Sequence, residues 1–439
     1  MSNATARLGA RTTDPCVRCD VLLGLDGVQV EHVERGPTGM TVTVSTPWQL
    51  MGCPRCGVVA VGRGRRVRAL HDVPGVVPVT IRWRQRTWRC PDAGCPVGVF
   101  VEQHPHLVRP RGSLTCRAVT WAISQLHHEH ATVQGLARQL GTTWKTLWRA
   151  VRPRLQALAD DESRLAGVAT LGVDEHVWHH TPHKSATKGP TMLTGMVDLT
   201  RDSDGTVHAR LLDLVPGRSG TVFAAWLTDR TAAFRDGVQV ATLDPFRGYA
   251  NALRDELGEA TPVLDAFHLV KLANDTLTAV RQRLSRDHKG RRGRLVDPSW
   301  ANCKLLLRGA DTLSERGWDR LEQVLRTDDP TDELGAAWGI KEQLRRLLKT
   351  TTLADAHEAK MLLGHYVMVA DMPETDRLWN TICAWWAEIE VLIITGVANA
   401  RTEAANTSIK NIKRTGRGFR NSDNYRARIL LSSAARRAV

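Results

Sequence analysis

The chain has 439 residues, which is too long for one compact core, so we expect two or three domains. Lys and Arg number 60 against 46 Asp and Glu, a formal net charge of +14, which favours a polyanionic partner. The longest apolar run, at 389–398, has about half the length of a membrane-spanning helix, and no signal-peptide pattern opens the chain. We therefore expect a cytoplasmic protein with no membrane association.

The nine cysteines are unevenly distributed, with six of them in pairs before residue 96. Two pairs flank two stretches of alternating polar and apolar residues, which predict strands. In a cytosolic chain such pairs favour a metal over disulfides, and four thiolates on two turns can close a tetrahedral zinc site. We predict a structural Zn²⁺ in a small β-rich domain, the alternative being reduced core thiols; the role of Cys16 and Cys19 stays open. The predicted ligands are Cys53, Cys56, Cys90 and Cys95.

Helical periodicity follows and ends in TVQGLARQLGTTWKTLWRAVRPRL. Gly141 supplies a turn between two helices that share an apolar face, and one of the threonines after it caps the second helix, which is typical of a helix-turn-helix. Lys145 and Arg149 lie one turn apart on the side expected to be exposed, so we predict that they reach the major groove of DNA. A solvated basic face is the alternative. Trp144 and Trp148 are expected to pack under the cysteine module, stacking on DNA being the alternative.

Short β-like runs dominate residues 168–272 and alternate with helical stretches in the order β-β-β-α-β-α-β. This order predicts an antiparallel meander followed by parallel crossovers, as in an RNase H-like mixed sheet. Asp174 lies in the first strand and Asp244 ends the fourth. These strands are neighbours in such a sheet, so the two carboxylates are expected to share a cleft, with Glu403 as a third acid from a later helix.

Three carboxylates without a thiol or imidazole suit a hard cation, Mg²⁺ or Mn²⁺. Two such ions about 4 Å apart would activate an attacking oxygen and stabilise the leaving one in phosphodiester chemistry. Glu403 begins a strongly basic helical face, on which Asn406 is a supporting residue. The basic residues expected to hold the DNA backbone are Lys410, Lys413, Arg414 and Arg417.

Two neighbouring acids compete for the metal positions. Glu175 follows Asp174 but points to the opposite face of its strand. Asp265 lies on the fifth strand, farther from the first strand than Asp244. We therefore keep Asp174 and Asp244 as ligands, and interpret Asp265 and His268 as supporting residues, with His268 hydrogen-bonding in the cleft wall.

Four segments resemble the DDE transposases of bacterial insertion sequences, specifically the family ISL3, and they stand in that family's order: LGVDEH at 171–176, LDPFRGYANAL at 243–253, LDAFHLVKLAN at 264–274 and RTEAANTSIKNIKRTGRGFRNSDNYRARILL at 401–431. The cysteine module followed by a helix-turn-helix also resembles that family's N-terminal half. The resemblance implies that Asp174, Asp244 and Glu403 are the catalytic acids. Asp265 and His268 match a D-x-x-H pattern shared by transposases with a helical insertion.

The implied fold is α/β and multidomain, with an RNase H-like core that an all-α insertion interrupts. Within the insertion, DHKGRRGR at 287–294 is expected to touch DNA. The implied boundaries are a zinc-binding module at 1–110, a helix-turn-helix domain at 111–163, the core at 164–280 and 393–439, and the insertion at 281–392.

The implied function is that of an insertion-sequence transposase in the bacterial cytoplasm, associated with the nucleoid. Its partners would be double-stranded DNA, both the terminal inverted repeats and the target, and a second copy of itself, since two ends must be cut together. Water would attack first, and the freed 3′-hydroxyl would then attack target DNA. A DNA-binding regulator descended from a transposase and a host nuclease on the same fold are the alternatives.

Overall fold

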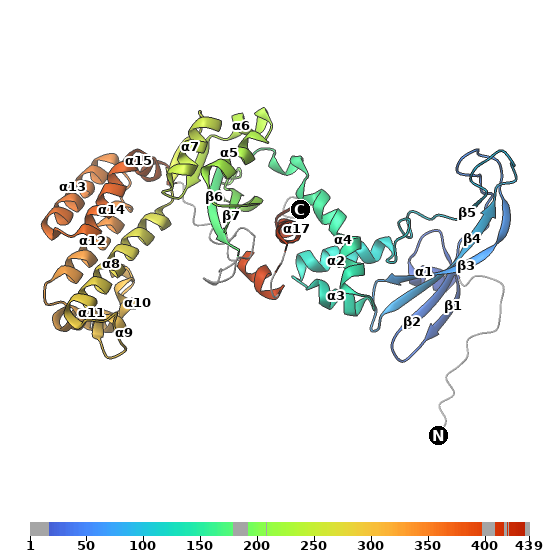
Figure 1. Ribbon diagram of the computed structural model, residues 1–439, viewed down its shortest axis with the longest axis horizontal. Helices are drawn as coiled ribbons and strands as arrows, with labels where there is room; N and C mark the ends of the chain where they lie inside the picture. Colours follow the sequence, from blue (N-terminus) through green and yellow to red (C-terminus); the bar gives the residue numbers. More distant parts are fainter. Residues whose placement is uncertain are drawn as a thin grey trace, which may run out of the picture. The chain divides into compact units, whose positions relative to one another are not determined.

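The chain forms two compact units in a computed structural model (Figure 1). The first unit comprises the residues up to 161 together with those from 411 onward, and the second comprises 162–410. The chain therefore passes from one unit to the other twice. The residues that the structure describes are 17–178, 192–207, 209–396, 409–416, 419 and 421–434.

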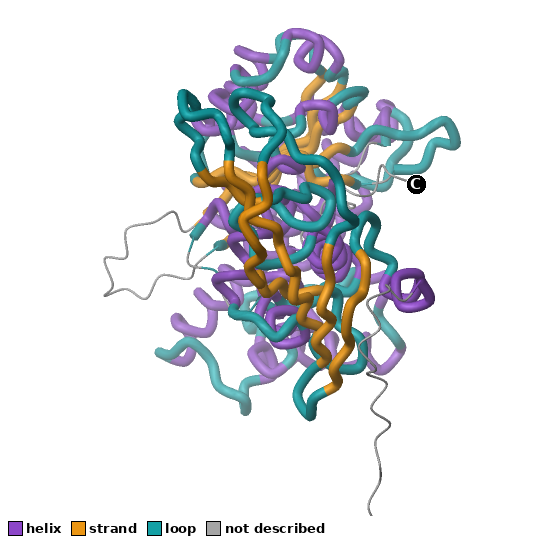
Figure 2. The backbone as a smooth tube through the Cα atoms, turned by 90° about the vertical axis from the view of Figure 1, so that its right-hand side faces the viewer, coloured by secondary structure: helices purple, strands orange, loops and turns teal. Residues whose placement is uncertain are grey.

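The first unit begins with a small β-rich module. Its elements are α1 (Val17–Leu23), β1 (Gln29–Arg35), β2 (Met40–Ser45), β3 (Val61–Asp72), β4 (Val79–Arg89) and β5 (Val99–Val101). The sheet order is β1-β2-β4-β3, with β5 paired to β4. Figure 2 draws the strands of the chain in orange. The long antiparallel strands β3 and β4 are the pair predicted between the cysteines. Ile81 and Trp83 of β4 are fully buried in the core of this module, whereas most of β3 is exposed.

Three helices follow, α2 (Cys116–His128), α3 (Val133–Gln139) and α4 (Trp144–Ala159). Gly141 adopts a left-handed φ of 66° between α3 and α4, as the predicted turn requires. The hydroxyl of Thr143 caps α4 by accepting a hydrogen bond from the Thr146 amide at 3.2 Å. The predicted apolar face is buried, which confirms the helix-turn-helix. Its residues are Leu136, Ala137, Leu140, Leu147 and Val151.

The C-terminal segment packs on the helix-turn-helix. Residues 409–415 are helical, and α17 (Ser422–Ala434) follows. Ala427 and Leu431 of α17 belong to the same hydrophobic core as α2 and α4. Arg426 forms an ion pair with Asp160 at 3.1 Å. Residues 393–439 were predicted to belong to the RNase H-like core, but the described residues from 411 onward cluster with the first unit, because α17 covers apolar side chains of the helix-turn-helix.

The second unit is built on a mixed sheet. After a 3-10 turn at Glu162–Leu165, its elements are β6 (Thr170–Val177), β7 (Met192–Asp198), β8 (Arg210–Pro216), α5 (Gly220–Thr228), α6 (Ala232–Gly237), β9 (Val240–Leu243), α7 (Arg247–Glu256) and β10 (Thr261–Leu264). The sheet order is β10-β9-β6-β7-β8. β6, β7 and β8 form an antiparallel meander, while β9 and β10 run parallel to β6. This arrangement confirms the predicted RNase H-like sheet.

The all-α insertion is also confirmed. Its elements are α8 (Ala266–Lys289), α9 (Pro298–Ala301), α10 (Cys303–Leu306), a 3-10 turn at Ala310–Thr312, α11 (Glu315–Asp328), α12 (Glu333–Leu347), α13 (Leu353–Ala370), α14 (Pro373–Ala384) and α15 (Trp386–Thr395). Leu344 and Ile389 share one core with the sheet, whereas Val280 and Leu321 belong to a separate core. Within the described part of the chain, no helix is both long and apolar enough to span a membrane.

The docking of α17 leads to a stability prediction. Leu431 is 3% exposed, so Leu431→Ala is expected to destabilise the first unit by about 2–5 kcal/mol through lost burial and a cavity. Calorimetry and hydrogen exchange of residues 116–159 measure this loss. Leu362→Ala, at a position 40% exposed on α13, is the control and should change little. Unchanged protection of residues 116–159 in Leu431→Ala would contradict the packing.

Candidate metal centres and nucleic-acid interface

Two aspartates are placed level with each other by the parallel pairing of β6 with β9. Gly172 of β6 pairs with Thr242 of β9. Asp174 lies two residues after Gly172, and Asp244 lies two residues after Thr242. Because side chains alternate between the two faces of a sheet with a period of two, both aspartates lie on the same face as Gly172 and Thr242. Asp174 is 7% and Asp244 is 8% exposed. The sheet thus brings together two buried carboxylates that are 70 residues apart in sequence.

His268 joins these aspartates from the first turn of α8. Its Nδ1 lies 2.9 Å from Asp244 Oδ1 and 2.9 Å from Asp265 Oδ2, and its Nε2 lies 4.0 Å from Asp174 Oδ1. Asp265 also caps α8, because its Oδ1 accepts a hydrogen bond from the Phe267 amide at 3.1 Å. Burial opposes the charged imidazole, but the carboxylates of Asp244 and Asp265 outweigh it and raise the pKa of His268 to about 10. His268 therefore holds the carboxylate of Asp244 in place.

The donor set suits a metal ion. Asp174 and Asp244 each offer a carboxylate oxygen, and these atoms and a ring nitrogen of His268 lie within 4.8 Å of one another. Asp244 Oδ1 is buried and, apart from its ion pair with His268, has no hydrogen-bond partner among the described residues. A buried carboxylate oxygen without such a partner fits a cation ligand. Glu403, the predicted third acid, lies outside the described residues.

The two competing acids each have other partners. Glu175 pairs with Arg218, and burial raises the pKa of its carboxyl despite this neighbour. Asp265 bonds to His268 and the start of α8, as described above. Sequence reasoning missed Arg218, because nothing in its local pattern indicates that it pairs with Glu175 at the edge of the cluster.

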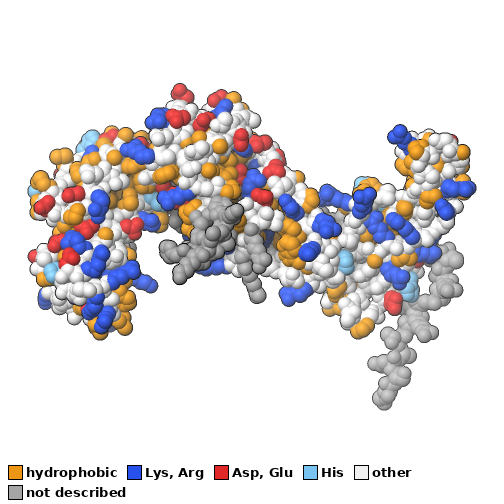
Figure 3. Space-filling view, in the orientation of Figure 1, with side chains coloured by type: hydrophobic (Ala, Val, Ile, Leu, Met, Phe, Trp, Pro, Cys, Tyr) orange, Lys and Arg blue, Asp and Glu red, His pale blue; other side chains and the backbone are white. Residues whose placement is uncertain are grey.

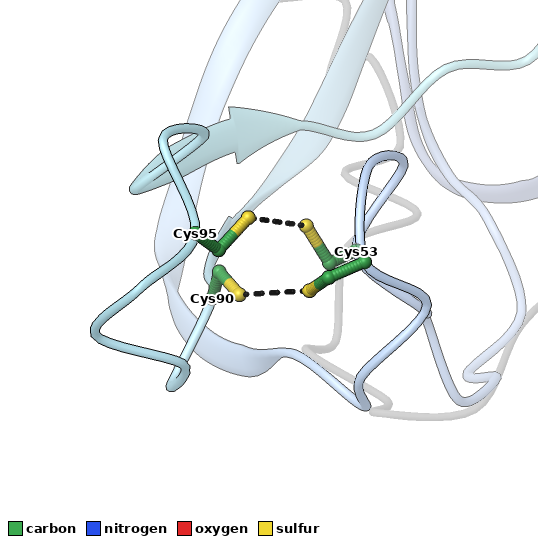
Figure 4. A group of neighbouring side chains, drawn as sticks. Cys53, Cys90 and Cys95 are labelled. Atoms are coloured by element: carbon green, nitrogen blue, oxygen red, sulfur yellow. Dashed lines mark hydrogen bonds between the residues drawn. The ribbon is translucent and has the colours of Figure 1, made fainter.

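The four predicted cysteines form the second cluster. Their sulfur atoms lie within 4.8 Å of one another, with Cys53 Sγ 3.7 Å from Cys95 Sγ and Cys56 Sγ 3.5 Å from Cys90 Sγ. Figure 4 shows the side chains of Cys90 and Cys95 facing the turn that carries Cys53. A tetrahedral ion with metal–sulfur bonds of about 2.3 Å keeps its sulfurs about 3.8 Å apart. The spacing therefore fits a four-sulfur metal site.

Backbone geometry prepares this cluster for a metal. The amides of Cys56 and Arg55 bond to the Cys53 sulfur and lower its pKa to about 7, which favours the thiolate that binds metals. Burial raises the pKa of Cys90 to about 12. A bound cation would stabilise the Cys90 thiolate and so offset the cost of ionising this buried thiol. Among the described residues, this cluster and the one around Asp174 are the groups of ligand-type side chains close enough to share an ion.

The comparisons with known proteins match both units. A DDE-type family described as "Transposase" matches residues 171–429, and the "Helix-turn-helix domain of transposase family ISL3" matches residues 102–155. The chain belongs to the ISL3 family of transposases. It is 26% identical over 392 residues to the transposase for insertion sequence element IS1557 of Mycobacterium tuberculosis, strain CDC 1551 / Oshkosh, covering 80% of this chain and 82% of that relative. The protein of the same description from strain H37Rv gives the same figures.

The predicted DNA-binding residues of this transposase lie on two elements. Lys145 and Arg149 are exposed on α4, the second helix of the helix-turn-helix. Lys410 and Arg414 are exposed in the helix at 409–415, whereas Lys413 is half-buried and burial lowers its pKa. Arg417 and Asn406 lie outside the described residues. On the face drawn in Figure 3, Lys and Arg side chains outnumber acidic ones over the first unit.

The basic segment of the insertion is partly structural. Lys289 pairs with Asp328, and Arg291 pairs with Asp297. The first contact joins the end of α8 to the end of α11, and the second closes the loop between α8 and α9. Arg292 and Arg294 are exposed, so only part of the segment's charge is available to DNA.

The two tryptophans of α4 differ from the expectation that they pack under the cysteine module. Trp148 is 8% and Trp144 40% exposed. They line a pocket together with residues 131–134 and with described residues of the C-terminal segment between Ile412 and Arg428, and none of the described residues of the cysteine module contributes to it. The reason is that the C-terminal segment occupies this side of the helix-turn-helix, which could not be read from the local sequence.

The cysteine cluster predicts one tightly bound metal ion. Cys90→Ser is expected to release it, because serine cannot supply the buried thiolate. Elemental analysis of the purified chain measures metal per protomer. Cys383→Ser, at an exposed cysteine outside the cluster, is the matched control and should retain the ion. Equal metal content in the two variants would exclude the four-sulfur site.

Proposed function

We propose that the chain is an insertion-sequence transposase that binds terminal inverted repeats and catalyses metal-dependent strand cleavage and strand transfer, with Asp174, Asp244 and Glu403 as the catalytic acids. The observation that carries this proposal is the level placement of Asp174 and Asp244 on adjacent parallel strands. It occurs in a chain whose residues 171–429 match a transposase family. Glu403 enters from its match to the family pattern alone.

Each residue of the cleft has a part in the reaction. Asp174 and Asp244 bind the metal, and His268 and Asp265 hold Asp244 in its orientation. Two bound Mg²⁺ or Mn²⁺ ions would activate the attacking oxygen and stabilise the leaving one. Water is then the nucleophile for cleavage and the freed 3′-hydroxyl for strand transfer. No covalent protein intermediate is required, so no Ser or Tyr nucleophile is assigned.

The first unit supplies DNA recognition. Zn²⁺ held by the four cysteines would fix the two turns that flank β3 and β4, since tetrahedral sulfur sites prefer this ion. Lys145 and Arg149 of α4 would enter the major groove, while Lys410, Lys413, Arg414 and Arg417 would contact phosphates. Paired cutting of two transposon ends implies at least a homodimer on DNA. Such a protein would act in the bacterial cytoplasm, on the nucleoid.

Cleavage of a duplex carrying the repeats that flank this gene tests the catalytic assignment. In Mg²⁺ or Mn²⁺, Asp244→Asn is expected to cut more than about 100-fold more slowly, since even residues that only support metal ligands commonly contribute 10–100-fold. Glu175→Gln is the matched control, because Glu175 is an acid beside the cluster that pairs with Arg218. Cutting rates are measured on denaturing gels.

The outcomes of this experiment separate the candidate functions. Cuts at the repeat boundary that vanish in Asp244→Asn while binding persists support the proposal. Repeat binding without cleavage by the native chain favours the transposase-derived regulator. Equal cutting of branched or random DNA favours a host nuclease.

The recognition helix is tested by binding. Arg149→Ala and Lys145→Ala are each expected to weaken repeat binding by about 1–3 kcal/mol if they contact base edges. A contact to phosphate instead reduces the salt dependence of binding by about one ion. Anisotropy titrations at several salt concentrations distinguish these cases. Arg254→Ala, whose side chain is 70% exposed on α7, is the control; losses no larger than its own would remove α4 from the interface.

A further inference from the structure

A pocket of about 380 Å³ opens in the first unit between the helix-turn-helix and the C-terminal segment. The start of α3 and the first turns of α4 form one side, and described residues of the C-terminal segment, among them Ile412, Asn424 and Arg428, form the other. None of the pocket's lining residues belongs to the cysteine cluster or to the cluster around Asp174. The lining residues on which the argument rests are Gln134, Trp144, Trp148, Asn424 and Arg428.

One wall of the pocket is aromatic. The rings of Trp144 and Trp148 are stacked, with centroids 5.7 Å apart and planes inclined by 24°. Trp148 is buried beneath, whereas Trp144 is the first residue of α4 and is 40% exposed. The pocket therefore offers a supported, flat and accessible ring surface beside the end of α4 expected to meet DNA. Such a surface favours another flat ring.

The guanidinium of Arg428, which lines the pocket, has no acidic partner among the described residues. Arg428 is 5% exposed, and its nearest hydrogen-bond acceptor is the Ala131 carbonyl oxygen, 3.5 Å from Nη2. Among the described residues, its Nη1 has no hydrogen-bond partner and no carboxylate forms an ion pair with Arg428. Burial lowers the pKa of Arg428 to about 10. A guanidinium removed from water without an anion is costly, so the site is suited to an anionic ligand.

Further unsatisfied polar atoms line the same pocket. Asn424 Oδ1 and Trp148 Nε1 are buried without hydrogen-bond partners among the described residues. The first accepts and the second donates, and the Gln134 side chain offers both kinds of group at the rim. Together these groups match a ligand that combines a flat ring, polar ring edges and a negative charge.

We propose that this pocket binds one unpaired nucleotide of a DNA strand, with the base stacked on Trp144 and the phosphate directed to Arg428. A base inside a duplex is covered on both faces and cannot enter, whereas single strands are commonly held by aromatic stacking and a basic groove. The proposal rests on the proposed function, because that function brings DNA to α4. Through this pocket, the first unit would bind a frayed or cut transposon end more tightly than an intact duplex.

Binding of two DNA probes to the full chain tests this proposal. One probe is a blunt duplex ending at the terminal repeat, and the other carries the same duplex with a three-nucleotide single-stranded extension. Without divalent metal, so that no strand is cut, we expect the extended probe to bind about 10-fold more tightly, as stacking of one base supplies. An extension of abasic residues should lose most of this gain.

Variants of the pocket residues test whether the pocket causes the preference for the extended probe. Trp144→Ala should reduce the ratio of the two dissociation constants to about 1, and Trp144→Phe should restore most of it, as expected of stacking. Arg428→Met should also lower the ratio. Because Arg428 is buried, calorimetry checks that the Arg428→Met protein folds. If it does not fold, the Trp144 variants alone test the proposal. Lys145→Ala should weaken both probes and leave the ratio unchanged.

Equal affinity of the native chain for the blunt and extended probes would overturn the proposal, as would a preference that survives Trp144→Ala. A preference kept with the abasic extension would show that phosphate alone is bound, which also overturns it. Failure of the proposed function would give a different result in the same experiment. In that case the blunt repeat duplex would bind no better than a random duplex, whatever the ratio.

Discussion

The parallel pairing of β6 with β9 is the constraint on which the rest of the second unit depends. The register that sets Gly172 opposite Thr242 also sets Asp174 level with Asp244. A shift of one residue would turn one carboxylate to the other face of the sheet. The buried neighbours of these strands prevent that shift, since Leu171, Val173, Ala241 and Leu243 all lie in the central core. The apolar positions that stabilise the sheet therefore also position the acids.

The path of the chain links recognition to chemistry. The chain leaves the first unit near residue 161, builds the sheet and the insertion, and returns near residue 411 to place α17 on the helix-turn-helix. Glu403 falls just before this return. The proposed third metal ligand is thus joined, by a few residues, to a segment that completes the core of the DNA-binding unit.

Local patterns were enough to predict much of this fold. Period-two runs and the helices between them predicted the strand order, and the paired cysteines predicted the four-sulfur cluster. Gly141 and the two threonines after it predicted the helix-turn-helix, in which Thr143 proves to be the cap. Partners distant in sequence were harder to predict. Leu431 is apolar in any context, but its packing against the helix-turn-helix depends on the whole chain path. His268 approaches Asp244 only because α8 starts directly after β10, and the buried, unpaired state of Arg428 has no sign in its neighbouring residues.

The measurement that tests the central claim most directly is anomalous diffraction from Mn²⁺ in crystals of the chain bound to a repeat-end duplex. The account predicts an anomalous peak between Asp174 and Asp244, with carboxylate oxygens at about 2.1 Å and Glu403 in the same coordination shell. A peak coordinated instead by Glu175 or Asp265, or a shell complete without Glu403, would contradict the assignment of the three acids.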